Sequence, residues 1–269
     1  MPTLRTNDAE LFYEEAGNGE PVLLLHGLGS STLDWAPQIE ALRGSYRVIA
    51  LDVRGSGRSR DLLKPGGPFS VTQFAADAAA LLDDRAAAPA HVVGLSMGGM
   101  IAFQLAVDSP TYIRTLTIVN SGPALVPRTR EEIRALRLRR LVSRVLGPRG
   151  MGRLLAKRLF PKPEQEDKRK LFRQRMAANN KRAYIASQEA LFGWSVLDRI
   201  AEIEAPTLVI SSDQDYVPVA VKEQWVRRMK HAELRVVTDA RHALPIEYPD
   251  KLNPLILEFL GGHRAAAGA

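Results

Sequence analysis

A short stretch around one serine constrains the fold of this chain more than any other part of the sequence. Residues 91–94 have the apolar, β-branched character of a buried strand, and residues 100–106 continue as a buried helix. Between them, Gly94 and Gly98 stand two residues before and two after Ser96. Side chains at those two positions would collide where a strand turns sharply into a helix, and the sharp turn exposes the serine hydroxyl. The stretch therefore predicts a nucleophilic Ser96; an ordinary strand-to-helix turn is the alternative.

The segments on either side of this turn alternate between strand and helix patterns. Val22 to Leu25 form a continuously apolar run, which is typical of a strand buried on both faces. Such alternation predicts an α/β protein with a mainly parallel sheet and helices on both faces. The expected strands are residues 11–15, 21–25, 46–51, 91–94, 113–119, 207–211 and 234–237, and the expected helices are residues 36–42, 70–85, 97–108, 217–229 and 248–260.

The alternation stops after Gly122 and resumes at Ala205. Apolar residues between these points recur at helical spacing, and Gly147-Pro148 and residues 161–163 divide them, so we expect a helical insertion. Residues 127–182 contain 19 Lys and Arg but only 5 Asp and Glu, a net +14, so the rest of the chain carries −7 of the total +7. This basic segment is either a solvated helical surface or a face for an acidic partner, an anionic substrate or a membrane surface.

Composition excludes several other classes of protein. The chain has no cysteine, which rules out disulfides, thiolate catalysis and zinc sites built on cysteine. Its first fifteen residues do not resemble a signal peptide, and no apolar run approaches 18 residues, so we expect a cytoplasmic protein without a membrane span. The loop at residues 26–31 is rich in glycine but lacks a nucleotide-binding spacing. No stacking surface accompanies the basic charge, so nucleic acid is not an expected partner.

A serine nucleophile needs a base and an acid that orients the base. His242 is the best-placed of the five histidines, because it follows the last predicted strand, at the carboxyl edge of the sheet. The loop after the preceding strand offers Asp213 and Asp215 as the acid, and we favour Asp215 because it lies at the bend before the next helix, which begins at Pro218. The order serine, aspartate, histidine along the chain is that of one hydrolase fold.

Two smaller motifs are interpreted as structural. Asp52 and Arg54 follow the strand at residues 46–51, where side-chain hydrogen bonds of a turn explain them as well as catalysis would. Ser70 and Gln73 have the spacing of a helix capping box.

Taken together, these motifs resemble the α/β-hydrolase superfamily over nearly the whole chain. The matching segments are His26-Gly27-Leu28-Gly29, Asp52-x-Arg54-Gly55-x-Gly57-x-Ser59, Gly94-Leu95-Ser96-Met97-Gly98-Gly99, Asp215-x-x-Pro218 and His242. The resemblance implies an eight-stranded, mostly parallel sheet in a core of residues 1–122 and 201–262, and an inserted helical cap of residues 123–200. Residues 263–269 are small and polar, so we expect a disordered tail there. It also implies an oxyanion hole formed by the backbone N–H groups of Leu28 and Met97.

Departures from related enzymes narrow the expected chemistry. Dehalogenases and epoxide hydrolases of this fold carry aspartate at the nucleophile position, and the epoxide hydrolases have a proline where this chain has Gly29. Many enol-lactonases replace the histidine that is His26 here, and carbon–carbon bond hydrolases usually have a longer oxyanion loop. The expectation is a serine hydrolase that cleaves a small to medium carboxylic ester or lactone through an acyl-enzyme, without a metal or organic cofactor.

Two other functions are compatible with the sequence. The basic segment suggests a thioesterase, or an esterase that acts on acyl groups carried by coenzyme A or an acyl carrier protein. A non-catalytic ligand receptor on the same fold is the second alternative, because a fold does not fix a function. Candidate walls of the substrate pocket, each equally explained as ordinary core, are Trp35, Leu125, Phe192 and Trp194.

Overall fold

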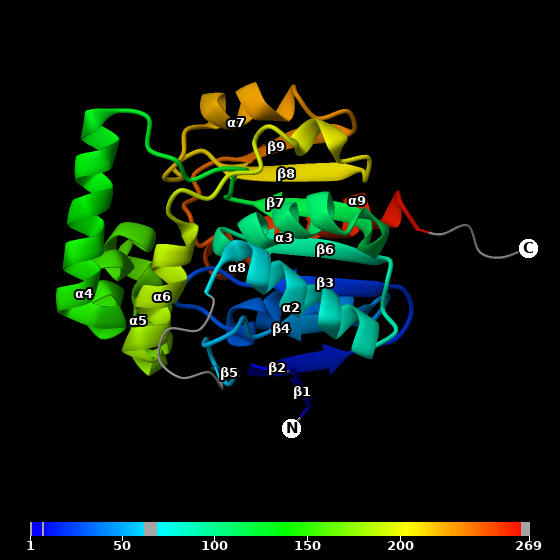
Figure 1. Cartoon of the computed structure of the whole chain (residues 1–269), viewed down its shortest axis with the longest axis horizontal. Coiled ribbons are helices and arrows are strands. Elements are labelled where there is room, and N and C mark those ends of the chain that lie inside the picture. Colours follow the sequence, from blue (N-terminus) through cyan, green and yellow to red (C-terminus); the bar gives the residue numbers. More distant parts are fainter. Residues whose placement is uncertain (1, 7, 62–68, 265–269) are drawn as a thin grey trace, which may run out of the picture.

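One mixed β-sheet runs through the centre of the computed structural model, which describes residues 2–6, 8–61 and 69–264 (Figure 1). Its strands are β1 (Thr3–Arg5), β2 (Ala9–Ala16), β3 (Pro21–Leu25), β4 (Arg47–Leu51), β5 (Arg60–Asp61), β6 (Ala90–Leu95), β7 (Ile113–Val119), β8 (Thr207–Ser212) and β9 (Ala232–Val237). They lie in the order β1-β2-β4-β3-β6-β7-β8-β9, with the short β5 against β2. All neighbours from β4 to β9 are parallel, and β1, β2 and β5 pair antiparallel. The predicted α/β class and mostly parallel sheet are confirmed.

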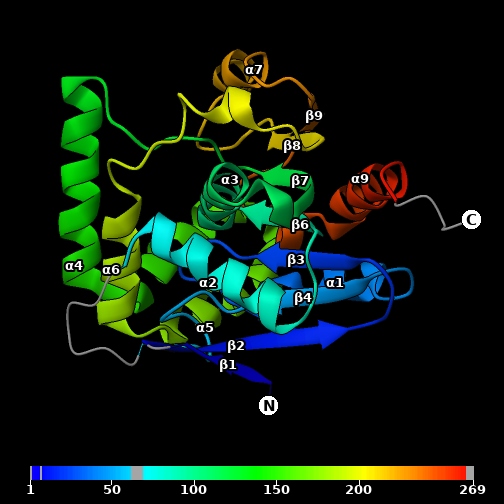
Figure 2. The same ribbon diagram turned by 45° about the vertical axis from the view of Figure 1, so that its right-hand side comes forward.

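Helices cover both faces of this sheet (Figure 2). They are α1 (Ala36–Leu42), α2 (Val71–Asp84), α3 (Met97–Asp108), α7 (Val219–Val226), α8 (Leu244–Glu247) and α9 (Pro249–Gly261). Alternate side chains of a strand point to opposite faces, so Leu23 and Leu25 of β3 join a core under α2 and α3. Val22 and Leu24 join a second core under α1 and α9. At the start of α2, the N–H of Gln73 donates to Oγ of Ser70 over 3.0 Å, the N-cap contact expected from the sequence.

The predicted helical insertion contains α4 (Arg130–Leu159), α5 (Glu166–Ala178) and α6 (Lys181–Leu191). Gly147 has a φ of 62° and precedes Pro148, so α4 is two helices joined at a kink. These three helices stand together beside the sheet in Figures 1 and 2. The two crossings between insertion and sheet run side by side, since the N–H of Val196 donates to the carbonyl of Pro123 over 2.8 Å. We propose from these paired crossings that residues 123–200 form a cap on a core of residues 1–122 and 201–262.

Two further expectations concern a membrane and the tail. No helix within the described ranges is long and apolar enough to cross a bilayer. Of the tail predicted at residues 263–269, residues 265–269 lie outside the described part of the chain. His263 is placed, and its ring nitrogen Nδ1 lies 2.8 Å from the carbonyl oxygen of Phe259 at the end of α9.

Candidate active site

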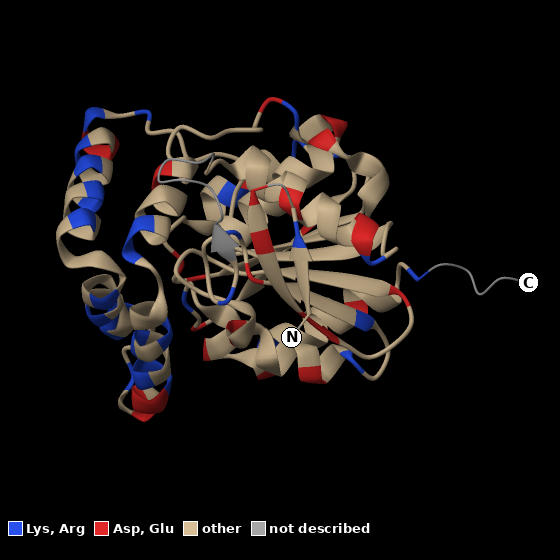
Figure 3. Cartoon of the chain, turned by 60° about the horizontal axis from the view of Figure 1, so that its bottom comes forward, with Lys and Arg blue, Asp and Glu red and all other residues tan. Residues whose placement is uncertain are grey.

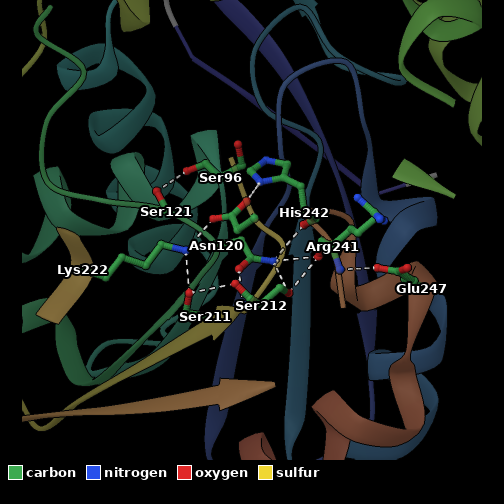
Figure 4. Close-up of polar contacts among 10 residues, drawn as sticks. Ser96, Asn120, Ser121, Ser211, Ser212, Lys222, Arg241, His242 and Glu247 are labelled. Carbon is green, nitrogen blue, oxygen red and sulfur yellow. Dashed lines mark hydrogen bonds and ion pairs between the residues drawn. The ribbon is translucent and has the colours of Figure 1, made fainter. Parts of the chain in front are cut away.

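Ser96 occupies the turn between β6 and α3 in a backbone conformation that few non-glycine residues adopt. Its φ is 52° and its ψ is −113°. Two hydrogen bonds hold this turn: the N–H of Ser96 donates to the carbonyl of Val119 over 3.0 Å, and Oγ of Ser121 donates to the carbonyl of Ser96 over 2.6 Å (Figure 4). Both partners lie at or just after the end of β7. The neighbouring strand thus holds the turn in its strained form.

The glycines around Ser96 are required by close packing. A Cβ atom on Gly98 would lie 1.9 Å from the carbonyl oxygen of Leu25 at the end of β3, and one on Gly94 would lie 2.3 Å from the carbonyl oxygen of Gly98. Backbone cannot yield by that much without moving a central strand. The steric reason for the predicted motif is therefore present at both positions.

His242 and Asp215 come together beside this turn. Nδ1 of His242 lies 2.5 Å from Oδ1 of Asp215, whose side chain is only 1% exposed. An ionised carboxylate can only accept, so Nδ1 carries the proton and donates, which leaves a lone pair on Nε2. In Figure 4 the Ser96 side chain points toward the imidazole ring of His242. Within the described residues, the Ser96 hydroxyl forms no hydrogen bond, either to His242 or to another group.

The structure separates Asp215 from the other acid that the sequence offered. Asp213 accepts the backbone N–H groups of Asp239 (3.0 Å) and Ala240 (3.1 Å), so it fixes the turn before His242 and does not contact the imidazole. His91, one of the other four histidines, is buried and bonds to Thr115, and burial lowers its pKa to about 4.

A buried lysine, which the sequence analysis did not identify, contacts Asp215. Nζ of Lys222, in α7, lies 2.5 Å from Oδ2 of Asp215 and donates to Oγ of Ser211 over 2.8 Å (Figure 4). The Lys222 side chain is 0% exposed. Burial raises the pKa of Asp215, but the hydrogen bond and charge of His242 and the charge of Lys222 outweigh it and lower the pKa to about 2. Asp215 is thus ionised throughout the neutral range.

Asn120 is a second residue that the sequence analysis missed. It follows β7 with a positive φ of 45° and links three segments at the sheet edge. Its Oδ1 accepts the N–H of Ser212 over 2.8 Å, and its Nδ2 donates to Oγ of Ser212 and to the carbonyls of Arg241 and His242 (2.9 to 3.1 Å). Asn120 therefore fixes the backbone that carries His242 to the end of β8.

The predicted oxyanion loop follows β3 and packs against Ser96. A Cβ on Gly27 would lie 3.5 Å from Cβ of Ser96, so Gly27 borders the serine directly and Leu28 follows it in the chain. His26 shapes this loop: its Nε2 accepts the N–H of Val53 over 3.0 Å, and its protonated Nδ1 donates to the carbonyl of Gly27 over 2.8 Å. In the described part of the chain, the N–H groups of Leu28 and Met97 have no backbone acceptor.

Residues of the helical insertion cover this loop. A Cβ on Gly29 would lie 2.4 Å from Sδ of Met176 and 3.1 Å from the Tyr184 ring, and Nδ2 of Asn179 donates to the carbonyl of Gly29 over 2.8 Å. On the other side of the site, the Tyr216 ring packs on the His242 imidazole at a centroid distance of 4.3 Å. The insertion therefore packs directly on the loop that follows β3.

The turn after β4 is structural, as the sequence analysis expects. Asp52 is fully buried and accepts the N–H groups of Thr32 (2.6 Å) and Arg58 (2.7 Å). Arg54 is also fully buried and pairs with Asp77 over 2.7 Å. None of these bonds is to Ser96 or His242.

The four candidate pocket walls occupy different surroundings. Trp35 is 1% exposed and packs in the core under α1 and α9. This agrees with the alternative that Trp35 is an ordinary core residue. Phe192 is half-buried beside Arg140, and Trp194 donates from Nε1 to Gln104 over 2.6 Å. Leu125 lines a cleft of about 700 Å³ between the start of the insertion and α7, together with Val217 and Trp225 among others. Of the four, Leu125 alone is among the residues that line this cleft.

Comparison with known proteins agrees with this architecture. The alpha/beta hydrolase fold family matches residues 20–249. The chain belongs to the α/β-hydrolase family. RutD of Azorhizobium caulinodans, which is named as a proposed carbamate hydrolase, is 32% identical to this chain. The similarity covers 97% of this chain and 98% of RutD.

Two solved structures of the α/β-hydrolase fold are also similar. The enol-lactonase from Burkholderia xenovorans LB400 is 26% identical, with a TM-score of 0.87, over 97% of this chain and 100% of its own. The thermophilic esterase from Thermogutta terrifontis, solved with malate bound, is 25% identical, with a TM-score of 0.85, over 98% of this chain and 100% of its own. These relatives support a hydrolase on this fold.

Proposed function

We propose that the protein is a serine hydrolase that cleaves a small to medium carboxylic ester or lactone through an acyl-enzyme, with Ser96, His242 and Asp215 as its catalytic triad. The observation that carries the proposal is the 2.5 Å hydrogen bond from His242 to Asp215 next to a serine whose φ is 52°. This is the arrangement of base, orienting acid and exposed nucleophile that acyl transfer requires.

The mechanism follows from these positions. Nε2 of His242 takes the proton of the Ser96 hydroxyl while Oγ attacks the carbonyl carbon of the substrate. The N–H groups of Leu28 and Met97 stabilise the oxyanion that forms, and one such donor is worth on the order of 10² to 10³ in turnover. His242 then gives the proton to the leaving alcohol, and water repeats the cycle on the acyl-enzyme, while Asp215 orients the imidazole throughout.

A carbamate is a second candidate substrate, and the similarity to RutD supports it. The carbonyl carbon of a carbamate accepts the same attack by a serine, so the triad would not need to change. Acyl groups on coenzyme A or an acyl carrier protein draw no support from the relatives described above. The similarity of an esterase and an enol-lactonase over nearly the whole chain supports an ester or lactone as the main substrate class.

Labelling with a fluorophosphonate tests the proposal independently of the physiological substrate. The reagent forms a bond to Oγ of an activated serine, so we expect stoichiometric labelling of the native protein and none of Ser96→Ala. Hydrolysis of p-nitrophenyl esters of increasing acyl length would then size the pocket. An unlabelled native protein would favour the receptor alternative.

A further inference from the structure

Each oxygen of the Asp215 carboxylate contacts a different side chain. Oδ1 accepts from His242, and Oδ2 faces Nζ of Lys222 at 2.5 Å. Lys222 is completely buried, and its other hydrogen bond goes to Ser211 over 2.8 Å. Burying an ammonium group is expensive unless it is paired, so this lysine is held in place by the same carboxylate that orients the base.

The lysine changes the charge balance of this buried group. With neutral His242, the ammonium of Lys222 and the carboxylate of Asp215 sum to zero. Protonation of His242 during catalysis brings the group to +1. Without the lysine, the same proton would convert a lone buried carboxylate into a neutral ion pair, which is a more favourable change in a site of low dielectric constant.

We propose that Lys222 is a positioning residue that lowers the proton affinity of the Asp215–His242 pair. The cation disfavours a further positive charge on the imidazole, so the imidazolium formed during the reaction gives up its proton to a leaving group more readily. This inference rests on the function proposed above, since it assigns His242 the proton transfers of that reaction.

Replacing Lys222 leaves the other ionisable residues near His242 in the chain. They are Tyr216, whose ring packs on the imidazole, Arg158 over the Tyr216 ring, Arg139 whose charge reaches Tyr216, Arg241 in the same loop, Glu247, which accepts the N–H of Arg241, and Asp213, which accepts the N–H of Ala240. A shift in the titration of His242 on replacing Lys222 would therefore report the loss of this one cation.

The test is an NMR titration of the His242 imidazole, assigned by the signal that disappears in His242→Asn. Lys222→Met removes the charge and keeps most of the side-chain volume, and we expect the midpoint to rise by about one pH unit. Ser211→Ala is the matched control, because it removes the other hydrogen bond of Lys222 but keeps the cation, so its midpoint should stay near that of the native protein. If Lys222→Met does not fold, Lys222→Gln carries the same test.

An unchanged midpoint in a folded Lys222 variant would overturn the inference and leave the lysine a structural role alone. The acid limb of kcat/KM should move upward with the NMR midpoint. The titration needs no turnover, so a native protein that hydrolyses nothing would count against the proposed function, whereas an unmoved His242 midpoint would count against the role of Lys222.

A separate observation concerns the outer face of the first half of α4, residues 130–146. Leu138, Leu141 and Val145 are 62%, 60% and 67% exposed, and their spacing of three and four residues aligns them in one stripe. Aligned exposed aliphatic side chains make this face a candidate interaction surface. Figures 1 and 2 show α4 at the outer edge of the molecule.

Arginines flank this stripe. Residues 130–146 contain six arginines and two glutamates, and Figure 3 shows basic positions along the helices of the insertion. Arg134 and Arg137 lie one turn before Leu138 and Leu141. Pairing this face with the same face of a second copy would bring arginines against arginines, which is unfavourable. A surface that is both anionic and apolar below its charges satisfies both sets of side chains.

We infer that this face of α4 docks on a bilayer containing anionic phospholipid. Sedimentation with vesicles of phosphatidylcholine, with and without about 30% phosphatidylglycerol, tests it. We expect binding to the anionic vesicles alone, reduced about tenfold in Arg134→Gln/Arg137→Gln and also reduced in Leu138→Gln/Leu141→Gln. Arg43→Gln/Arg227→Gln removes two exposed arginines elsewhere and should bind as the native protein does.

Two results would overturn this second inference. One is the absence of sedimentation with anionic vesicles. The other is a dimer in analytical ultracentrifugation that Leu138→Gln/Leu141→Gln dissociates, since a second copy would then be the partner of this face.

Discussion

Nζ of Lys222 lies 2.5 Å from Oδ2 of Asp215, and neither side chain is more than 1% exposed. The pair links α7 to the loop that carries Asp215. Each charge depends on the other, because an unpaired buried ion is strongly destabilising. Substitution of Asp215 should therefore affect both catalysis and folding.

For Asp215→Asn we predict a fall in kcat of about 10⁴, because an amide does not hold the His242 tautomer that leaves Nε2 free. The variant should also lose about 3 to 5 kcal/mol of unfolding free energy, since Lys222 is left buried without its counter-ion. Ester kinetics and urea unfolding measure the two losses. Adding Lys222→Met should restore much of the stability but not the turnover; a double variant less stable than Asp215→Asn would contradict this explanation.

Stability should fall in acid partly through Asp215. Its pKa is about 2 in the folded protein, below the ordinary value of 3.8, so its ionisation stabilises the fold above about pH 4 and this contribution is lost as the pH falls toward 2. The contribution is about 2 kcal/mol. Urea unfolding over this range should show a shallower loss for Asp215→Asn than for the native protein. Equal slopes would show that Asp215 does not titrate in this way.

Gly98→Ala should prevent folding or destabilise the protein by several kcal/mol, because the added Cβ would lie 1.9 Å from the carbonyl oxygen of Leu25 in a central strand. Gly44→Ala is the matched control, since a Cβ at Gly44 meets nothing within 4 Å. Its thermal midpoint should stay close to that of the native protein or rise slightly. Comparable losses in the two variants would mean that the close contact at Gly98 is unimportant.

Asn120→Ala removes four hydrogen bonds between β7, β8 and the loop of His242. Three of the lost partners are backbone groups, so we expect a loss of about 2 to 3 kcal/mol in unfolding free energy. We also expect kcat to fall about tenfold or more, because the imidazole is no longer held in place. Circular dichroism melting and ester kinetics measure these effects. A variant with native kcat would show that the loop holds its position without Asn120.

The sequence predicts the parallel part of the sheet closely because its strands are apolar runs bounded by turn residues. The expected strand at residues 113–119 and the expected helix at residues 36–42 match β7 and α1 at both ends. The edge strand β1 and the short helix α8 were not predicted. β1 is three largely exposed residues that pair only with β2, so no apolar pattern marks it.

At the site, motif and order along the chain are enough to nominate Ser96, Asp215 and His242. They do not reveal Lys222, which looks like an ordinary charged residue of a surface helix. Its burial depends on how α7 packs against β8, a tertiary arrangement with no local signature. Asn120 and Met176 were also not identified, because their roles depend on contacts with segments far away in the sequence.

Turnover of a short-chain p-nitrophenyl ester by the native protein and by Ser96→Ala tests the central claim most directly. We predict measurable hydrolysis by the native protein and a loss in kcat of about 10⁴ to 10⁶ in the variant, whose fold should be unchanged. Residual turnover in Ser96→Ala close to the native value would contradict the assignment of Ser96 as the nucleophile.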